Sequence, residues 1–343
     1  MIIDRDHLRR EFAATAGWGL ARVERLPSDA STRTYYRLRD GGRRALLMDA
    51  PPPREKPAEF LHMARLLHRL DYSAPMILAS DPVAGFILLE DLGDDTYTRL
   101  LARGADEAPL YGLAIDLLAD LHDRFDPASA QGIPPYSDEI LLSEAGQFVD
   151  WFLPEIAGRP TEAAMKDEYL ALWQAALPAA RAVPASLTLR DYHVDNLMLL
   201  DGRPGLQACG LLDFQDSLIG PIGYDLVSLL EDARRDVPPA LADAMLARYL
   251  ALRPTVDAKD LGRSMAFLGA QRHAKVIGIF CRLARRDGKP VYLKHLPRLW
   301  RLIARSLEHP DLAALKGWID RHVPADLRGV PPALRTLYPE AVP

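Results

Sequence analysis

Two aspartates and an asparagine in the middle of the chain have the side chains and the spacing for one kind of chemistry. Asp191 and Asn196 lie five positions apart in a polar loop, and Asp213 follows a short apolar segment. A carboxylate in such a loop can orient a hydroxyl group and accept its proton. Amide and carboxylate oxygens are the hard ligands that magnesium prefers. Transfer of a phosphoryl group from ATP requires these parts and little covalent chemistry from the protein. The pattern therefore predicts that Asp191 is the base and that Asn196 and Asp213 bind Mg²⁺ beside ATP.

The same loop admits other interpretations. An ordinary polar loop between strands would need none of this chemistry, but the combined spacing and the flanking apolar segments favour the catalytic interpretation. A zinc-type site at His193 and Asp195 is disfavoured, because no cysteine or third spaced histidine accompanies them. We expect His193 to brace the loop. Asp225, near the start of the next helix, is expected to be a helix cap and a second loop brace.

The hydrophobic pattern predicts the elements that must hold this loop. Residues 197–200 and 210–212 form short apolar strands, with a turn at Asp201-Gly202. Towards the N-terminus, β-branched and aromatic residues predict strands, and apolar residues at helical spacing predict helices. The predicted strands are 21–26, 34–39, 44–49, 76–79 and 86–90, and the predicted helices are 4–15 and 57–70.

The character of the chain changes after Gly93, where helical spacing of apolar residues takes over. We therefore predict an α+β fold in which residues 1–92 form a small, β-rich, nucleotide-binding lobe. Residues 93–329 are predicted to form a large helical lobe that carries the catalytic loop and binds the acceptor. The Pro-rich end, 330–343, is predicted to be a loose tail.

Composition limits the class of protein. The 343 residues carry a net charge of −5, which does not indicate nucleic-acid binding. No apolar run reaches the roughly 20 residues that cross a bilayer, and the charged residues 1–11 lack a signal-peptide core. The two cysteines, Cys209 and Cys281, form no C-x-x-C pair, so packed thiols are expected and a zinc cluster is not. We expect a cytoplasmic monomer with no nucleic-acid or membrane partner.

The catalytic loop resembles that of the aminoglycoside phosphotransferase and choline kinase superfamily. Asp191 and Asn196 match its loop, and Asp213 matches the metal-binding turn that protein kinases share as D-F-G. Leu189 stands where protein kinases have a histidine, and Gln215 replaces the glycine of the turn, which fits the small-molecule branch. The resemblance implies a two-lobed, protein-kinase-like fold and the use of ATP and Mg²⁺.

Further segments resemble the bacterial anomeric kinases for N-acetylmuramate and N-acetylglucosamine, which act in cell-wall recycling. These segments are 29–38, 48–51, 89–94 and 189–193. The resemblance implies an amino sugar as the small-molecule substrate and its anomeric hydroxyl as the acceptor.

The resemblance also assigns contacts to the nucleotide. Ser31 and Thr32, with neighbouring backbone N–H groups, would cover the phosphates, and an ordinary turn is the alternative. Glu90, Asp91 and Leu92 would form a hinge that offers backbone groups to the adenine.

One part is missing from the third strand. Met48 occupies the position where the superfamily usually has a phosphate-pairing lysine, for which Glu59 would be a plausible partner. Lys56, Arg44 and Arg33 are the candidate replacements, and the sequence does not choose among them.

Few residues in the sequence point to the binding site of the acceptor substrate. Arg272 or Lys275, in a basic helix, would meet an anionic group such as the lactyl carboxylate of N-acetylmuramate. A solvated helix face is the alternative. Asp216 would contact the sugar or a second metal ion, or else cap a turn.

Two rival functions stay open. One is a kinase for another small alcohol, such as an aminoglycoside, choline or homoserine; the basic helix around 272–286 argues against a polycationic aminoglycoside. The other is a nucleotide-binding pseudokinase or regulatory module without turnover. Met48 supports that rival, whereas the intact Asp191, Asn196 and Asp213 oppose it.

Overall fold

The computed structural model describes residues 4–27 and 32–341. The chain divides into two compact units, Met1–Leu117 with Val194–Ser217, and Leu118–His193 with Leu218–Pro343. The predicted lobes, 1–92 and 93–329, are each one continuous stretch of the chain, whereas each of these units is made of two separate stretches. Helix α4 (Glu107–Arg124) passes from one unit into the other.

The first unit is built on an antiparallel sheet whose strand order is β1-β2-β3-β5-β4. Its strands are β1 (Arg22–Arg25), β2 (Thr34–Asp40), β3 (Arg43–Asp49), β4 (Ile77–Asp81) and β5 (Phe86–Glu90). Each predicted strand of this region is therefore confirmed within about two residues at its ends. The turn between β2 and β3 contains Gly41 at a φ of +57°, a conformation that glycine adopts without steric cost.

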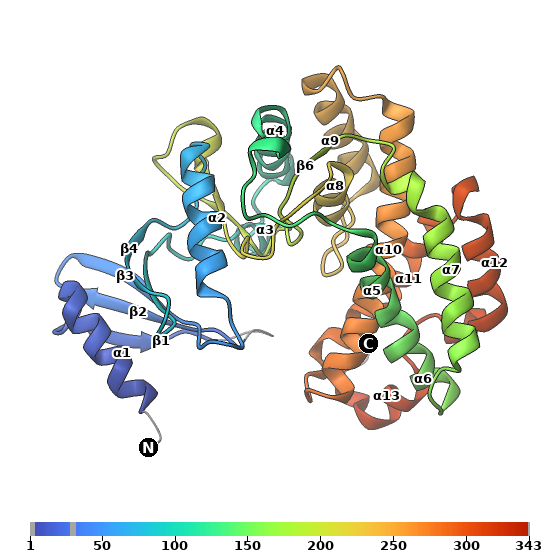
Figure 1. The fold of residues 1–343 in the computed structure, drawn as a ribbon, viewed down its shortest axis with the longest axis horizontal. Coiled ribbons are helices and arrows are strands. Elements are labelled where there is room, and N and C mark those ends of the chain that lie inside the picture. The colour runs from blue at the N-terminus through green and yellow to red at the C-terminus, as the bar shows by residue number, and fades with distance from the viewer. Residues whose placement is uncertain (1–3, 28–31, 342–343) are drawn as a thin grey trace. The chain divides into compact units, whose positions relative to one another are not determined.

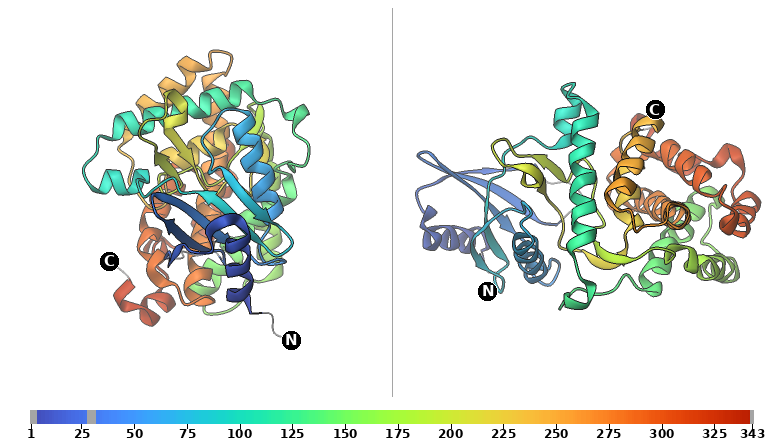
Figure 2. Two further views of the ribbon diagram at one scale, coloured as in Figure 1. Left: turned by 90° about the vertical axis from the view of Figure 1, so that its left-hand side faces the viewer. Right: turned by 90° about the horizontal axis from the view of Figure 1, so that it is seen from above.

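Side chains alternate along each strand, so the two faces of this sheet carry different sets of side chains. One face packs Leu38, Leu47 and Leu88 against α1 (Arg5–Ala13) and against Trp18 of the π-helical turn that follows it. The opposite face carries a separate row of side chains, in which Tyr35 pairs with Met48, Arg37 with Leu46, and Leu46 with Leu89. Figures 1 and 2 show α1 on one side of the sheet and α2 (Pro57–Arg69) on the other.

The first unit also includes a hairpin from the middle of the chain. Its strands are β7 (Leu197–Leu199) and β8 (Cys209–Leu211), and a 3-10 turn (Gly205–Ala208) lies between them. The hairpin is tied to earlier segments by backbone hydrogen bonds, from Leu211 N–H to the Ser73 carbonyl (2.8 Å) and from Leu199 N–H to the Asp95 carbonyl (3.0 Å). Helix α3 (Tyr97–Ala102) contacts β7. The polar residues on either side of these short strands are thereby placed in the β-rich unit.

The second unit is organised around the long helix α10 (Ala258–Arg285), which contacts α5, α7, α8 and α11. Figure 1 shows α10 among these helices. The helices of the unit are α5 (Asp138–Gln147), α6 (Leu153–Ala157), α7 (Ala163–Ala180), α8 (Gly223–Leu230), α9 (Pro239–Leu252), α11 (Leu296–Ser306), α12 (Ala313–His322) and α13 (Pro332–Leu337). Strands β6 (Ala185–Thr188) and β9 (Leu218–Pro221) pair antiparallel.

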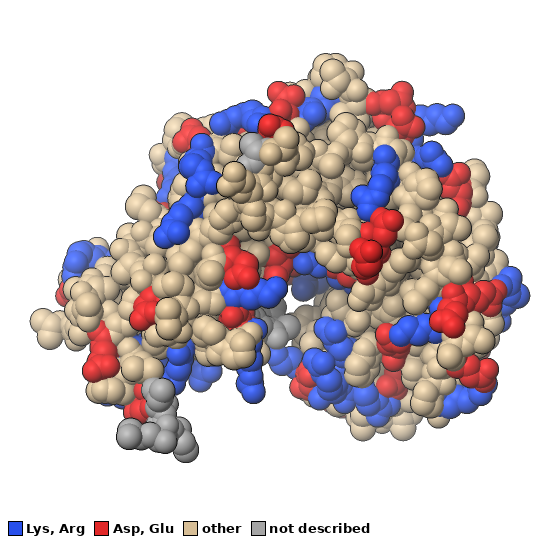
Figure 3. Space-filling view, in the orientation of Figure 1, with Lys and Arg blue, Asp and Glu red and all other residues tan. Residues whose placement is uncertain are grey.

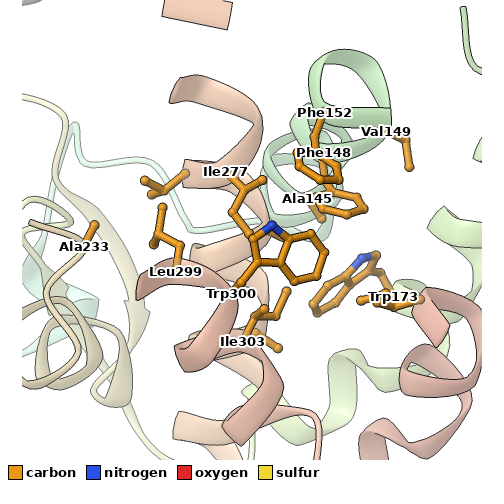
Figure 4. Packing of buried hydrophobic residues seen from close by; sticks show 14 of the residues in the cluster. Ala145, Phe148, Val149, Phe152, Trp173, Ala233, Ile277, Leu299, Trp300 and Ile303 are labelled. Atoms are coloured by element: carbon orange, nitrogen blue, oxygen red, sulfur yellow. The ribbon is translucent and has the colours of Figure 1, made fainter. Parts of the chain in front are cut away.

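Aromatic side chains dominate the core of the second unit. Figure 4 shows Trp300 of α11 beside Phe148, Phe152 and Ile277. The Trp300 ring centroid lies 5.2 Å from that of Phe152 and 5.8 Å from that of Phe148. Offset and edge-to-face pairs of this kind contribute about 0.5–1.5 kcal/mol each beyond the burial of their area.

The predicted loose tail is wrong for the described residues of that segment. Leu334 of α13 and Val330 are buried in the core of the second unit, and the Tyr338 hydroxyl donates to the Ala284 carbonyl at 3.0 Å. Three apolar side chains of this segment, Val330, Leu334 and Tyr338, lie four positions apart, but the prolines among them masked this helical spacing in the sequence. Both cysteines are buried thiols, as expected.

The surface carries charges of both signs. On the face shown in Figure 3, Lys and Arg side chains are interspersed with Asp and Glu side chains. Within the described part of the chain, no helix combines the length and the apolar character needed to cross a membrane.

Candidate active site

The two predicted metal ligands lie at the open end of the β7–β8 hairpin in the first unit. Leu197 pairs with Leu211, and the next pair along, Asn196 and Leu212, is joined by a hydrogen bond from Leu212 N–H to the Asn196 carbonyl (3.0 Å). Asp213 follows directly, with a φ of +57° that turns the chain out of the strand. A non-glycine residue in that conformation is held there by its surroundings and is found preferentially at functional sites.

Asn196 and Asp213 face a pocket of about 420 Å³ that lies wholly within the first unit. This volume is within the usual range for small-molecule sites. The pocket combines apolar walls with a few charged groups. Its apolar residues include Leu46, Leu89, Leu92, Met198, Leu212 and Phe214, and its charged residues are Arg33, Arg37, Glu90, Asp94, Arg99, Asp195 and Asp213.

The predicted hinge, Glu90 to Leu92, borders the pocket, but two of its side chains are engaged elsewhere. The Glu90 carboxylate binds Arg203 and accepts the Met76 N–H at 3.3 Å. The Asp91 carboxylate is fully buried and binds the Arg37 guanidinium, with its Oδ2 2.9 Å from Arg37 Nε. A ligand in the pocket would therefore meet the backbone of this segment and not the Asp91 carboxylate.

At the other end of the pocket, a guanidinium lies between two carboxylates. Arg33 Nη2 lies 2.5 Å from Asp213 Oδ1, and Arg33 Nε lies 3.5 Å from Glu55 Oε2. The Thr32 hydroxyl donates to the same Glu55 carboxylate. Thr32 is thus linked through Glu55 to Arg33 of the pocket wall, whereas Ser31, the other predicted phosphate contact, lies outside the described residues.

The donor set suits magnesium that is bound together with a nucleotide. The described residues contain no group of three or more His, Cys, Asp or Glu side chains that would hold a metal by themselves. Asn196 and Asp213 supply oxygen donors, and Mg²⁺ is commonly held by one or two protein ligands plus phosphate oxygens. Of the zinc-type pair that the sequence disfavours, His193 belongs to the second unit, where it contacts Arg234 (3.1 Å), and Asp195 belongs to the first.

The predicted base, Asp191, belongs to the second unit, in a loop that follows β6. The preceding residue, Arg190, has a φ of +70°. The Asp225 carboxylate accepts the N–H groups of Leu189 (2.6 Å) and Arg190 (2.9 Å), and the Ser228 hydroxyl donates to the Arg190 carbonyl (3.2 Å). The interpretation of Asp225 as a loop brace is confirmed, but its interpretation as a helix cap is wrong: Ile222 is the N-cap residue of α8, and Asp225 lies within the first turn. Burial raises the pKa of Asp225 to about 7, although these N–H groups and Arg272 oppose that rise.

The side chain of Arg190 ends in a buried charge cluster on α5 and α10. Glu144 accepts hydrogen bonds from Arg190, from the Tyr136 hydroxyl and from Gln271 (3.2 Å), and its Oε1 lies 2.7 Å from Lys275 Nζ. Burial would raise the pKa of Glu144, but the charges of Lys275 and Arg190 lower it to about 2. Glu144 therefore couples the residue before the predicted base to helix α10.

The predicted acceptor contacts on α10 are buried, so the alternative of a solvated helix face is wrong for them. Arg272 is 6% exposed, donates to the Ser228 hydroxyl (2.6 Å) and lies over the Tyr224 ring, 5.8 Å from its centroid. The Lys275 side chain is 14% exposed and is neutralised by Glu144. Both residues share the second unit with Asp191; burial would lower the pKa of each, but Tyr224 and, to a smaller extent, Asp191 are among the groups that raise it. Asp216 is exposed in the first unit, where Gln215 Nε2 contacts its carboxylate (3.2 Å).

Three residues with a clear place in the site were missed at the sequence level. Arg37 lines the pocket and binds Asp91; its alternation with Arg33 along one strand face was the available signal. Glu55 precedes α2, whereas the predicted partner Glu59 is exposed. The sequence did not predict the role of Glu144, because its partners Arg190 and Lys275 are distant in the sequence.

The chain is similar to known proteins over most of its length. A model of the Phosphotransferase enzyme family matches residues 22–268. An N-acetylmuramate/N-acetylglucosamine kinase of Caulobacter vibrioides is 38% identical, with 95% of this chain and 98% of the relative covered. A kinase of the same name from Pseudomonas aeruginosa is 37% identical, with 89% and 90% covered. Among solved structures, an ADP-bound aminoglycoside phosphotransferase gives a TM-score of 0.58 at 14% identity, with 89% of this chain and 99% of that chain covered. The structural likeness confirms the predicted kinase-like fold.

Proposed function

Because this chain belongs to the Phosphotransferase enzyme family, we propose that it is an ATP-dependent kinase that phosphorylates the anomeric hydroxyl of N-acetylmuramate and N-acetylglucosamine. One observation carries the choice of acceptor: relatives that bear this name are 36–38% identical to the chain over most of its length. We propose that the protein works as a monomer in the cytoplasm, where recycled cell-wall sugars would reach it.

The pocket of the first unit is the proposed nucleotide site. Its apolar walls would enclose the adenine, and the backbone of residues 90–92 would meet the adenine edge. Asn196 and Asp213 would hold Mg²⁺ at the phosphate end, with Thr32 nearby. An ion held by these two residues would offset the negative charge that develops on the phosphate oxygens.

Asp191 is the proposed base. It would orient the anomeric hydroxyl and accept its proton, and this hydroxyl is more acidic than that of an ordinary alcohol, so a weak base is sufficient. The hydrogen bonds of Asp225 and Ser228 to the backbone around Arg190 fix the chain immediately before it. A base that is already positioned costs no reorganisation during transfer.

The acceptor contacts remain proposals. Lys275 is already bound by Glu144 and Tyr224. Arg272 instead donates to the Ser228 hydroxyl and has no carboxylate within ion-pair distance among the described contacts of the second unit. We propose that Arg272 provides the positive field for the lactyl carboxylate of N-acetylmuramate. Asp216, which is exposed and linked through Gln215 to the proposed metal ligand Asp213, would contact the sugar.

The test is a measurement of ADP release with a panel of acceptors, followed by NMR of the product. We expect magnesium-dependent turnover with N-acetylmuramate and N-acetylglucosamine and phosphate on the anomeric carbon. Turnover with only choline, homoserine or an aminoglycoside would support the rival acceptor class. ATP binding with no turnover on any acceptor would support the pseudokinase.

The role of Asp191 has its own test. Asp191→Asn is expected to lower kcat by at least about a hundredfold, the lower end for a positioned base, with ATP affinity unchanged. Asp201→Asn is the matched control, because Asp201 is an exposed turn residue of the hairpin. Turnover by Asp191→Asn at the rate of this control would remove Asp191 from the role of base.

A further inference from the structure

Three arginines line the pocket of the first unit, and they differ in what holds them. Arg37 is 6% exposed and is bound by Asp91 (2.9 Å) and Asp94 (3.0 Å). Arg99 is also bound by Asp94, at 3.2 Å. These two cations therefore lie at the end of the pocket formed by residues 90–94. Arg33 lies beside Asp213, the proposed metal ligand.

The sheet register explains this separation. Arg33, Tyr35 and Arg37 alternate along β2 and its entry, so their side chains project to the same face, and each lines the pocket. Arg33 and Arg37 are four residues apart, a spacing of about 13 Å along an extended strand. Tyr35 is paired with Met48 on β3, whose side chain brings no charge to this face. Arg33 thus supplies positive charge next to the place where the third strand has none.

The surroundings of Arg33 fix its guanidinium. The side chain is 11% exposed and lies between Glu55, at 3.5 Å from Nε, and Asp213, at 2.5 Å from Nη2. Glu55 also accepts the Thr32 hydroxyl. A guanidinium presents several N–H donors in one plane, a geometry that matches phosphate oxygens.

The other two candidate cations are placed less well. Lys56 is exposed and borders a small neighbouring hollow with Met48 and Gln215. The Arg44 side chain is 57% exposed and lies 3.9 Å from Asp91, at the opposite end of the pocket from Asp213.

We infer that Arg33 binds the phosphate groups of the nucleotide, in place of the cation that β3 lacks at Met48, and that Glu55 orients it for this contact. The inference rests on the proposed nucleotide site. It adds that the phosphate-binding cation comes from the entry of β2, from a residue that also contacts the metal ligand Asp213. Arg33 would then contact the phosphate groups of the nucleotide and not its adenosine part.

The experiment compares binding of ATP, ADP and adenosine by calorimetry, in the presence of Mg²⁺, to the full chain and its variants. Arg33→Met is expected to raise the Kd for ATP and ADP by about ten- to a hundredfold, the loss of a charge-assisted hydrogen bond. The Kd for adenosine should change less than about twofold, because adenosine has no phosphate. Glu55→Gln should produce a smaller loss of the same kind, since it leaves the charge of Arg33 in place. Lys56→Met is the matched control and should bind all three ligands as the wild type does.

An equal loss for adenosine and ATP in Arg33→Met would overturn the inference, because it would indicate a collapsed pocket. Unchanged ATP binding in Arg33→Met, or an ATP-specific loss in Lys56→Met, would overturn it as well. If Arg33→Met does not fold, Arg33→Lys gives the same comparison: it keeps the charge but loses the planar fork, and an ATP-specific loss of several-fold is expected. A wild-type protein that binds no ATP would instead refute the proposed function.

Discussion

Replacing Glu144 by glutamine would remove one negative charge from a buried site that faces two cations. Glu144 is 9% exposed, and its Oε1 is shared by Arg190 and Lys275. Glutamine has nearly the same size and keeps one acceptor oxygen, so the main change is electrostatic. The variant therefore measures how much the buried ion pairs between α5, the loop that precedes Asp191 and α10 contribute to stability.

The magnitude follows from the pKa of Glu144, which is about 2 in the folded protein against an ordinary value of 4.5. At 1.36 kcal/mol per pKa unit, the difference contributes about 3 kcal/mol to the free energy of unfolding at pH 7. Because the folded pKa is lowered, this contribution is fully present above pH 4.5 and is lost as the pH falls towards 2. At pH 3, about 1 kcal/mol of it remains.

Urea unfolding of the wild type and Glu144→Gln at a series of pH values is the assay. We expect the variant to be less stable by about 3 kcal/mol at pH 7, with the gap narrowing between pH 4.5 and 3. Its kcat should also fall, since Arg190 precedes Asp191 and loses its partner. Glu155→Gln is the matched control: Glu155 is equally buried and also binds α10, but its partner Arg285 is 42% exposed and can return to water. A stability gap that does not depend on pH, or equal losses in both variants, would refute the electrostatic reasoning.

Three further predictions address the metal site, the loop brace and the helix packing. Asp213→Ala should raise the Mg²⁺ concentration needed for half-maximal activity by at least about tenfold, and a magnesium titration that matches the wild type would exclude Asp213 as a ligand. The pKa of Asp225 is raised to about 7 by burial, so the wild type should lose stability relative to Asp225→Asn as the pH rises from 4 to 7 and not beyond; parallel pH profiles from urea unfolding would contradict this. A Cβ at Gly278 would lie 2.1 Å from the Gln147 carbonyl oxygen, so Gly278→Ala should destabilise the protein by about 1–3 kcal/mol. On the same helix, Gly262 has no atom within 4 Å of such a Cβ, so Gly262→Ala should instead stabilise by up to about 1 kcal/mol; equal thermal shifts in the two variants would count against the predicted close contact.

Local sequence patterns were sufficient for the elements of the first unit. The alternation in residues 34–40 and 43–49, and the apolar run 86–90, each determine a strand because the side-chain period is a property of the segment itself. The same holds for the hairpin around Asn196 and Asp213, whose short strands are apolar and whose polar neighbours are adjacent in sequence. The chain's membership of a phosphotransferase family was visible in these motifs as well.

Contacts between distant residues were decided only by the tertiary structure. Our inference of Arg33 in preference to Lys56 and Arg44 depends on the register that pairs Tyr35 with Met48 and on a hairpin 180 positions away in the sequence that brings Asp213 to Arg33. Asp225 accepts the N–H of Leu189 only because α8 packs against the loop. No sequence spacing predicts this hydrogen bond, because the two residues are far apart in the chain. A charged residue in a helix pattern looks the same whether it faces water or a buried partner. Burial and pairing are properties of the packed chain, and they were what distinguished the buried cations on α10 from a solvated surface.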